Sequence, residues 1–420
     1  MFALALGLLL ASDDVQTRVV PIGLGWSKNS VNATVFRESS VTSFGETQYV
    51  AYYDGDSTMV IARRKLSSTV WEKNRTQYKG NTSDAHNGIS IGVDGSGLLH
   101  VSWDHHGNPL NYVTATSPGS IELGEKRSMT GSVERSVTYP QFFRLPDGRL
   151  LFFYRDGGSG NGNVVLNRYD HVTKSWTQLH NNLIDGEGER NAYWQACVDE
   201  NGGLHISWVW RETGDVATNH DLCYAYSEDA GVTWRRSDGS VYEGKINEQN
   251  AQVVARIQQN SELINQTSMA TKESHLVIAG YWRPSGASAP QVMLVSLTED
   301  GWKTEQVSER TLDFKLSGGG TKRLPLSRPQ VMVGKAGPLV VYRDEERGGR
   351  VVLAWKREGV WTQTDLTSKS VGMWEPTYDR ALWKHKGELH LFLQKVDQID
   401  AEGLAETEPT VVSVLEVRLR

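Results

Sequence analysis

The chain has 420 residues and a formal net charge of −6, with 44 Lys and Arg residues spread along its length. Dispersed basic residues in an acidic protein argue against nucleic acid as a partner, so an anionic ligand would need a local basic site. The two cysteines, Cys197 and Cys223, are too few for a disulfide framework, although one bridge remains open.

Residues 1–12 read MFALALGLLLAS, an apolar run that ends in small residues and precedes Asp13 and Asp14. This pattern is typical of a secretory signal peptide, and the run is too short to cross a bilayer. It lacks Lys and Arg, so a frayed apolar N-terminus is the alternative. No other segment is apolar enough to span a membrane. We predict a secreted or periplasmic protein without a membrane partner, with a single domain over residues 17–420.

One pattern recurs along the chain: a Gly turn, an alternating apolar strand with an aromatic residue near its end, and then a charged residue. The length exceeds the roughly 250–300 residues of one ordinary core, which also favours a repetitive architecture. The seven copies are QYVAYYD (48–54), GLLHVSWDHH (97–106), GRLLFFYRD (148–156), GLHISWVWRE (203–212), HLVIAGYWR (275–283), GPLVVYRDE (337–345) and GELHLFLQK (387–395).

A partner strand precedes each copy. The partner strands are entered through NATVF (32–36), HNGISIGV (86–93), YPQFFRL (139–145), YWQACV (193–198), QTSMAT (266–271), RPQVMV (328–333) and EPTYDRALW (375–383). Units of this size built from antiparallel strands are propeller blades, so the sequence predicts an all-β, seven-bladed β-propeller. The segments 17–24 and 411–420 are both strand-like and could share one blade. Two stacked β-sandwich domains are the alternative fold.

Polar residues from both series should meet on one face, because the start of one strand and the end of the next lie at the same edge of an antiparallel meander. The guanidinium group of Arg binds carboxylates through two N–H donors, aromatic rings stack on sugar rings, and His or Tyr can exchange protons. The predicted partner is therefore an anionic poly- or oligosaccharide. Strand starts supply His86, Asn87, Tyr139, Tyr193, Trp194, Arg328 and Glu375, and strand ends supply Asp54, His105, His106, Arg155, Arg211, Arg283 and Arg343.

Structural roles compete with these functional interpretations. Arg155 and Arg211 could pair with the adjacent acids Asp156 and Glu212, and Tyr139 could be an ordinary strand-start aromatic residue. His86 and His106 break the repeat pattern, which favours a functional role. Three other histidines occupy equivalent repeat positions in GLLH, GGLH and GELH and are interpreted as packing residues: His100, His205 and His390.

Four stretches carry a resemblance to a known family: GWSKNSVNATVFR (25–37), SDAHNGISIGVDGSGLLHVSWDHH (83–106), TYPQFFRLPDGRLLFFYRDGGSGNGN (138–163) and RNAYWQACVDENGGLHISWVWRET (190–213). They resemble the BNR-repeat propellers that contain ulvan lyases and rhamnose-glucuronate lyases. The resemblance implies a polysaccharide lyase that cleaves a rhamnose- and glucuronate-containing glycan by β-elimination at a uronic acid.

The resemblance also implies roles for individual residues. His86 and His106 would flank the scissile linkage, Tyr139 would take part in proton transfer, and Arg155 would neutralise the uronate carboxylate. Arg211 would bind substrate. The choice of His106 over His105 as the catalytic histidine rests on spacing alone. The rest of the predicted substrate-binding set is Asn87, His105, Tyr193, Trp194 and Arg328.

Elimination at a uronate needs a cation at the carboxylate, a base for the C5 proton and an acid for the leaving oxygen, so no cofactor is predicted. A structural Ca or Zn remains open, with His220 and Cys223 as a weak partial metal site. We expect a monomer.

Two other functions remain open. An exo-α-L-rhamnosidase would need a carboxylate pair, and none is evident among Asp54, Asp104, Asp156 and Glu375. A non-catalytic glycan-binding propeller would leave the two site histidines without a role.

Overall fold

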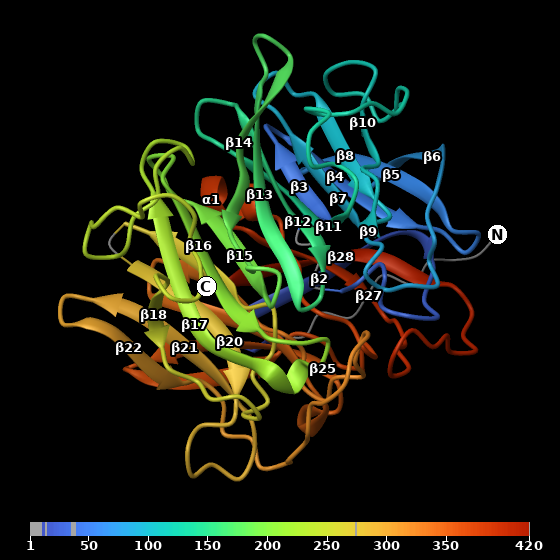
Figure 1. The fold of residues 1–420 in the computed structure, drawn as a ribbon. Helices are drawn as coiled ribbons and strands as arrows, with labels where there is room; N and C mark the ends of the chain where they lie inside the picture. Colours follow the sequence, from blue (N-terminus) through green and yellow to red (C-terminus); the bar gives the residue numbers. More distant parts are fainter. Residues whose placement is uncertain (1–10, 13–14, 35–38, 274, 420) are drawn as a thin grey trace.

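The computed structural model describes residues 11–12, 15–34, 39–273 and 275–419. The described strands form seven antiparallel sheets arranged around an axis (Figure 1), which confirms the predicted seven-bladed β-propeller. The first strands of neighbouring blades pack on one another around this axis, β3 on β7, β7 on β11, β11 on β15, β15 on β19 and β19 on β23.

The first three blades are built as follows. Blade one contains β3 (Val41–Phe44), β4 (Thr47–Tyr53), β5 (Thr58–Lys65) and β6 (Glu72–Lys79), and blade two contains β7 (Ile89–Val93), β8 (Leu99–Trp103) and β10 (Tyr112–Thr114). Blade three has five strands, β9 (His106–Asn108), β11 (Val137–Arg144), β12 (Leu150–Gly158), β13 (Asn161–Asp170) and β14 (Ser175–Ile184).

The next three blades have four strands each. Blade four contains β15 (Asn191–Val198), β16 (Leu204–Arg211), β17 (Asn219–Ser227) and β18 (Gln252–Ala255), with η1 (Val216–Thr218) before β17. Blade five contains β19 (Ser268–Lys272), β20 (His275–Trp282), β21 (Gln291–Thr298) and β22 (Gly301–Gln306). Blade six contains β23 (Gln330–Gly334), β24 (Gly337–Asp344), β25 (Arg350–Arg357) and β26 (Val360–Asp365), with η2 (Glu345–Arg347) after β24.

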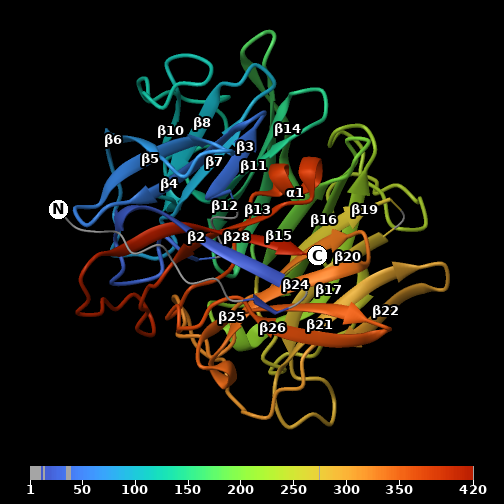
Figure 2. The same ribbon diagram turned by 180° about the vertical axis from the view of Figure 1, so that it is seen from behind.

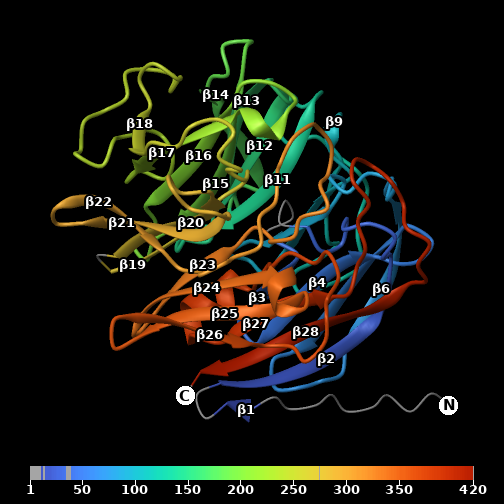
Figure 3. The same cartoon turned by 90° about the horizontal axis from the view of Figure 1, so that it is seen from below.

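The seventh blade joins the two ends of the described chain. Its order is β1 (Ala11–Ser12), β2 (Val15–Gly25), β28 (Thr410–Leu419) and β27 (Leu389–Gln394). Strands β2 and β28 lie side by side (Figure 3) and pair from Val15 opposite Leu419 to Gly25 opposite Thr410. The two terminal strands therefore share one blade, as the sequence indicated.

One predicted partner strand is wrong and another is cut short. Residues 32 and 33 of NATVF lie in a turn, residues 35 and 36 lie outside the described residues, and the first strand of blade one is β3 instead. In EPTYDRALW, Tyr378 pairs antiparallel with Leu391 of β27, and the chain then forms a helix, α1 (Arg380–Lys386). The Asp379 side chain accepts a hydrogen bond from the Leu382 N–H at its start, and Gly387, at φ 67°, ends it.

Neighbouring blades bury large aromatic side chains between them. Trp194, Trp208 and Trp210 lie in one cluster with Phe153, and Trp103 lies in another, all nearly or fully excluded from solvent. Burying such side chains removes much apolar surface from water and favours the closed ring.

Three sequence expectations concern features outside the blades. The predicted signal peptide falls mainly on residues 1–10, which lie outside the described residues. No helix in the described part of the chain is long and apolar enough to cross a membrane. Cys197 and Cys223 are free, so the single bridge left open is not formed.

Candidate active site

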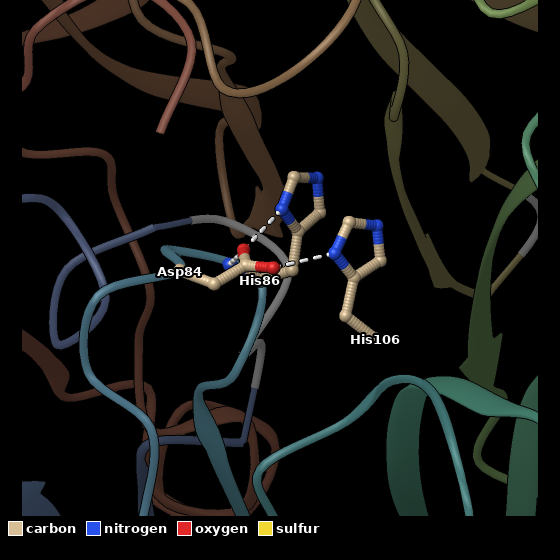
Figure 4. A group of neighbouring side chains, drawn as sticks. All are labelled: Asp84, His86 and His106. Atoms are coloured by element: carbon tan, nitrogen blue, oxygen red, sulfur yellow. Dashed lines mark hydrogen bonds and ion pairs between the residues drawn. The ribbon is translucent and has the colours of Figure 1, made fainter. Parts of the chain in front are cut away.

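Two histidines and one carboxylate form a compact group near the axis. The rings of His86 and His106 are stacked with centroids 4.0 Å apart and an interplanar angle of 12°. Asp84 bridges them at one edge of the stack, with 2.7 Å from its Oδ1 to His86 Nδ1 and 2.6 Å from its Oδ2 to His106 Nδ1 (Figure 4). The other nitrogen of each ring points away from Asp84.

Asp84 determines which ring nitrogens are available. An ionised carboxylate only accepts hydrogen bonds, so both Nδ1 atoms carry hydrogen and the Nε2 atom of a neutral ring keeps its lone pair. Burial disfavours the Asp84 charge, but hydrogen bonds from His106 and His86 outweigh this and hold its pKa well below the usual range. Burial lowers the pKa of His86 despite the bond to Asp84. His86 is therefore neutral near neutral pH and can accept a proton.

The strand β9 brings His106 to this group. Although it follows β8 of blade two, β9 pairs with β11 of blade three, where His106 lies opposite Thr138. Asp104 at φ 65° and Gly107 at φ 75° turn the chain, and the Gly107 N–H donates to Thr138 Oγ1 at 2.8 Å. His106 is 39% exposed in its side chain, whereas His86 is 8% exposed.

A backbone irregularity positions Tyr139. The pairing of β11 with β12 shifts register between Thr138 and Gln141, and Tyr139 has φ 57°. A bulky residue in the left-handed region costs about 1–3 kcal/mol and is found mainly at functional sites. The bulge directs the Tyr139 ring toward the histidines, with its centroid 6.0 Å from that of His86.

Two guanidinium groups lie against two phenol rings beside the histidines. The Arg155 Cζ is 4.8 Å from the Tyr139 ring centroid and 5.9 Å from that of Tyr193, and the Arg211 Cζ is 5.2 Å from the Tyr193 ring. The Tyr193 hydroxyl is 2.5 Å from Ser159 Oγ. A Cβ on Gly162 would lie 2.9 Å from Arg155 Cδ, so a glycine at this position leaves room for the Arg155 stem.

The two phenols titrate in opposite directions. Burial and Tyr193 raise the pKa of Tyr139, although Arg155 and Arg211 act against this. Burial opposes ionisation of Tyr193 as well, but the charges of Arg155 and Arg211 and hydrogen bonds with Ser159 and Tyr139 lower its pKa below the ordinary value. The two phenols titrate as a coupled pair, and the charges of Arg155 and Arg211 favour the ionised form of Tyr193.

Part of the Arg155 guanidinium group has no hydrogen-bond partner among the described residues. Arg155 is 2% exposed, and among the described residues its Nε and Nη1 atoms have no hydrogen-bond partner. It forms no ion pair with Asp156 or any other described carboxylate, and Glu212 pairs with Arg190 and His220 rather than with Arg211. Neither Arg155 nor Arg211 therefore forms the ion pair with the adjacent acid that was its structural alternative. A buried cation without an anion is costly, which indicates a place for an anionic group.

Several predicted binding residues have other surroundings. Trp194 is fully buried in the core beside Phe153, because Tyr193 and Trp194 are neighbours on one strand and face opposite sides of the sheet. His105 is also fully buried, bonds to Ser102 Oγ and Asn111, and has a pKa that burial lowers to about 3. Asn87 donates to the Asn81 carbonyl. All three side chains are buried within the fold, and their contact with substrate stays a prediction.

Other side chains of the predicted face form ion pairs or donate hydrogen bonds to backbone carbonyls. Arg328 pairs with Glu375 at 2.5 Å, and Arg283 pairs with Glu262 at 2.9 Å. Asp54 pairs with Arg75, and Arg343 is fully buried with its guanidinium on backbone carbonyls, including that of Trp374. On the predicted face, one set of residues thus lies together, which we call the Tyr/Arg/His group: His86, His106, Tyr139, Tyr193, Arg155 and Arg211. The other side chains bond within the fold.

His220 and Cys223, the predicted partial metal site, are not joined by a third His, Cys, Asp or Glu ligand among the described residues. His220 bonds to Glu212, while Cys223 is buried in the core of blade four. Among the described residues, one group has the ligand spacing for an ion, and it is Asp84, His86 and His106. Here both Asp84 oxygens accept hydrogen bonds from ring nitrogens, so the group is already internally satisfied.

Sequence reasoning missed Asp84 and Ser159. Asp84 lies two residues before His86 in SDAHNG, where an Asp in a turn has an ordinary structural interpretation. Its pairing with His106 depends on the path of β9, which no local pattern signals. Ser159 lies in the Gly-rich turn 157–160, and its contact with Tyr193 crosses from blade three to blade four.

Comparison with known proteins places the chain in a family. The sequence profile described as "BNR repeat-containing family member" matches residues 47–310. The chain belongs to this family. The matched BNR repeat region includes every residue of the Tyr/Arg/His group.

The curated relatives that this chain matches are ulvan lyases. The long isoform from Glaciecola sp. (strain KUL10) is 46% identical over 192 residues, 33% of this chain and 19% of the relative. The long isoform from Pseudoalteromonas sp. (strain PLSV) is 30% identical over 229 residues, 42% of this chain and 23% of the relative. The chain thus matches about a fifth of the length of these relatives.

Solved structures support the fold over nearly the whole chain. The polysaccharide lyase Uly1 superposes with a TM-score of 0.67 at 16% identity, over 90% of each chain. A PL25 ulvan lyase bound to -[GlcA(1-4)Rha3S]- gives a TM-score of 0.67 at 12% identity, over 94% of this chain and 95% of that one.

Proposed function

We propose that this protein is a polysaccharide lyase that cleaves a rhamnose- and glucuronate-containing, ulvan-like glycan by β-elimination at the uronic acid. The observation that carries the proposal is the buried Arg155, whose Nε and Nη1 have no partner in the described part of the chain, beside two phenols and a histidine pair. The matches to curated ulvan lyases support the substrate class.

Arg155 has the first role in this chemistry. Removing the C5 proton of a uronate places a second negative charge beside the carboxylate, which must be neutralised before a base can act. A guanidinium offers two parallel N–H donors to a carboxylate. Arg211 lies on the other side of Tyr193 and donates to the carbonyls of Thr213 and Gly214, so it acts mainly through its charge.

The phenol pair and the histidine pair supply the proton-transfer groups. Tyr193 is the phenol that loses its proton more readily, and Tyr139 lies between Tyr193 and His86, so a proton can be taken up on this side. His86 and His106, each with Nδ1 held by Asp84, present Nε2 to the same space. A base for the C5 proton and a separate acid for the C4 oxygen are what this elimination needs.

The test is a polysaccharide screen read by the ultraviolet absorbance of a 4,5-unsaturated uronate. A glucuronate–rhamnose polymer should produce this absorbance with the wild-type protein. Arg155→Ala should lower the rate at least 100-fold with little change in melting temperature, since Nε and Nη1 of Arg155 bond to none of the described residues. Arg149→Ala, which removes a surface arginine of the same blade, is the matched control. Activity retained in Arg155→Ala, or no absorbance with any uronate polymer, would contradict the proposal.

A further inference from the structure

A large cavity lies at the opposite end of the axis from the Tyr/Arg/His group. Its volume is about 1650 Å³, and it is lined by the final residues of β3, β7, β11, β15, β19 and β23 together with α1. Helix α1 packs against β3 and β27 (Figure 2). Tyr139 is near the start of β11 and Arg144 is its last residue, and five residues of strand span roughly 17 Å.

The lining of this cavity is strongly basic. Among its described lining residues, eight are Lys or Arg and three are Asp or Glu. The whole chain carries a net charge of −6, so this excess of positive charge is local. A concave surface lined by one sign of charge attracts ligands of the other sign.

The arginines and lysine on one wall are held by rings and carbonyls. The Arg144 Cζ is 5.0 Å from the Phe44 ring, and the Arg380 Cζ is 5.8 Å from the Phe143 ring while Nη1 donates to the Ala196 carbonyl. Lys384 Nζ donates to the Asp199 carbonyl at 2.7 Å.

Arg144 and Lys384 are not neutralised by a direct salt bridge. Neither side chain forms one among the described residues, although Asp379 and Asp94 act on Arg144, and Asp199 and Glu200 on Lys384, at longer range. Partial burial and the charges of Arg144 and Lys384 lower the pKa of His385, while Asp379 acts against them.

Aromatic surfaces lie beside these charges. Trp355 and Trp383 line the cavity and pack, partly buried, against the core. Rings of this kind stack on pyranose faces, while Arg and Lys bind carboxylate or sulfate groups. Clefts of roughly 300–1,000 Å³ hold drug-sized ligands, so this larger one has room for several sugar rings.

We propose that this cavity is a second, non-catalytic binding site for an anionic oligosaccharide. It would hold a polymer on the face opposite the Tyr/Arg/His group, so that the protein has two contacts with its glycan. The inference is independent of the elimination chemistry, because it rests on the lining of the cavity alone.

The experiment uses the full chain with Arg155→Ala, which silences turnover so that binding can be measured at equilibrium. Calorimetric titration with a glucuronate–rhamnose polymer should show binding, and adding Arg144→Gln with Lys384→Gln should weaken it at least tenfold. The matched control is Arg256→Gln with Lys303→Gln, which removes two exposed cations that do not line the cavity and should leave binding unchanged. Neutral dextran should not bind.

A second variant protects the test against misfolding. Lys335→Glu reverses a charge at an exposed lining position in the turn after β23 and should also weaken binding. Equal affinity in the cavity variants and the control would overturn the inference, as would a poly-glutamate peptide that binds there in preference to the polymer. A wild-type protein that gives no unsaturated product, but binds the polymer through this cavity, would contradict the proposed lyase activity and leave the second site standing.

Discussion

Three residues, Asp84, His86 and His106, show how neighbours decide chemistry at the residue scale. A lone surface histidine has no fixed tautomer, but a carboxylate on Nδ1 fixes the proton there and exposes Nε2 as an acceptor. Asp84 does this for both rings at once. Its low pKa means that it stays ionised throughout the range in which His86 titrates. We therefore treat Asp84 as a positioning residue.

Asp84→Asn should lower kcat at least tenfold, because an amide can no longer accept from both rings. Hydrogen bonding to Asp84 favours the protonated form of His86, so removing this carboxylate lowers the His86 pKa further. If neutral His86 is required, the acidic limb of the kcat/KM profile should move to lower pH. A pH–rate profile compared with wild type measures this, and an unchanged kcat with an unmoved limb would contradict the role given to Asp84.

The phenol pair gives a second prediction at this scale. Tyr139→Phe removes the proton that Tyr139 shares with Tyr193, and it also removes a hydrogen bond that lowers the Tyr193 pKa. We expect a loss of at least 100-fold in kcat with KM changed less than fivefold, because the ring contact with Arg155 is kept. Steady-state kinetics on the uronate polymer measure both constants. Ser136→Ala, on the neighbouring loop, serves as the control. A variant with full kcat would exclude Tyr139 from proton transfer.

At the scale of the element, β9 explains why the site is where it is. This three-residue strand leaves blade two and joins the first strand of blade three, so His106 lies beside Tyr139 rather than on an outer loop. The bulge in β11 and the Gly107 contact with Thr138 fix the two strands relative to each other. Short irregular strands thus carry the catalytic side chains, while the regular blades hold them in place.

Thr138→Val tests this arrangement, because it keeps the shape of the side chain and removes the hydroxyl that accepts from the Gly107 N–H. The lost hydrogen bond should cost about 1 kcal/mol of unfolding free energy. The rate should fall about tenfold, since His106 is less well positioned. Urea unfolding and kinetics together measure the effect, with Thr114→Val in blade two as the control. A rate equal to wild type would show that β9 needs no such anchor.

Some elements could be predicted from the sequence and others could not, for physical reasons. The seven second strands were predictable because each is a short apolar run rich in β-branched, aromatic or other large apolar residues. The region 375–383 offered a similar pattern, but the side chain of Asp379 caps a helix there, and a cap depends on backbone geometry rather than on hydropathy. Tyr193 and Trp194 could not both face the ligand, because adjacent strand residues point to opposite faces. The hydrogen bond between His106 and Asp84 could not be predicted, because it depends on the pairing of β9 with β11 in the tertiary structure.

At the scale of the whole molecule, the pairing of β2 with β28 closes the ring. Leu415 of β28 is fully buried between strands of the seventh blade, whereas Val411 of the same strand is 47% exposed. Closure makes every blade a neighbour of two others, so the described blades should unfold together rather than one by one.

Leu415→Ala should therefore destabilise the entire protein by about 2–5 kcal/mol, the usual cost of a buried Leu→Ala change. Val411→Ala should change the unfolding free energy by less than about 0.5 kcal/mol. Chemical denaturation followed by both fluorescence and circular dichroism measures this. A separate early transition in Leu415→Ala, with the remaining signal unshifted, would mean that the seventh blade opens independently.

The central claim is elimination at a uronic acid, and digestion of a glucuronate–rhamnose polymer in heavy-oxygen water tests it most directly. An elimination adds no water, so the account predicts fragments without solvent oxygen at the cleaved linkage and with a 4,5-unsaturated uronate at the new non-reducing end. Mass spectrometry and ultraviolet absorbance read the two properties on one sample. One labelled oxygen per broken bond, without new absorbance, would contradict the lyase account and favour a glycoside hydrolase.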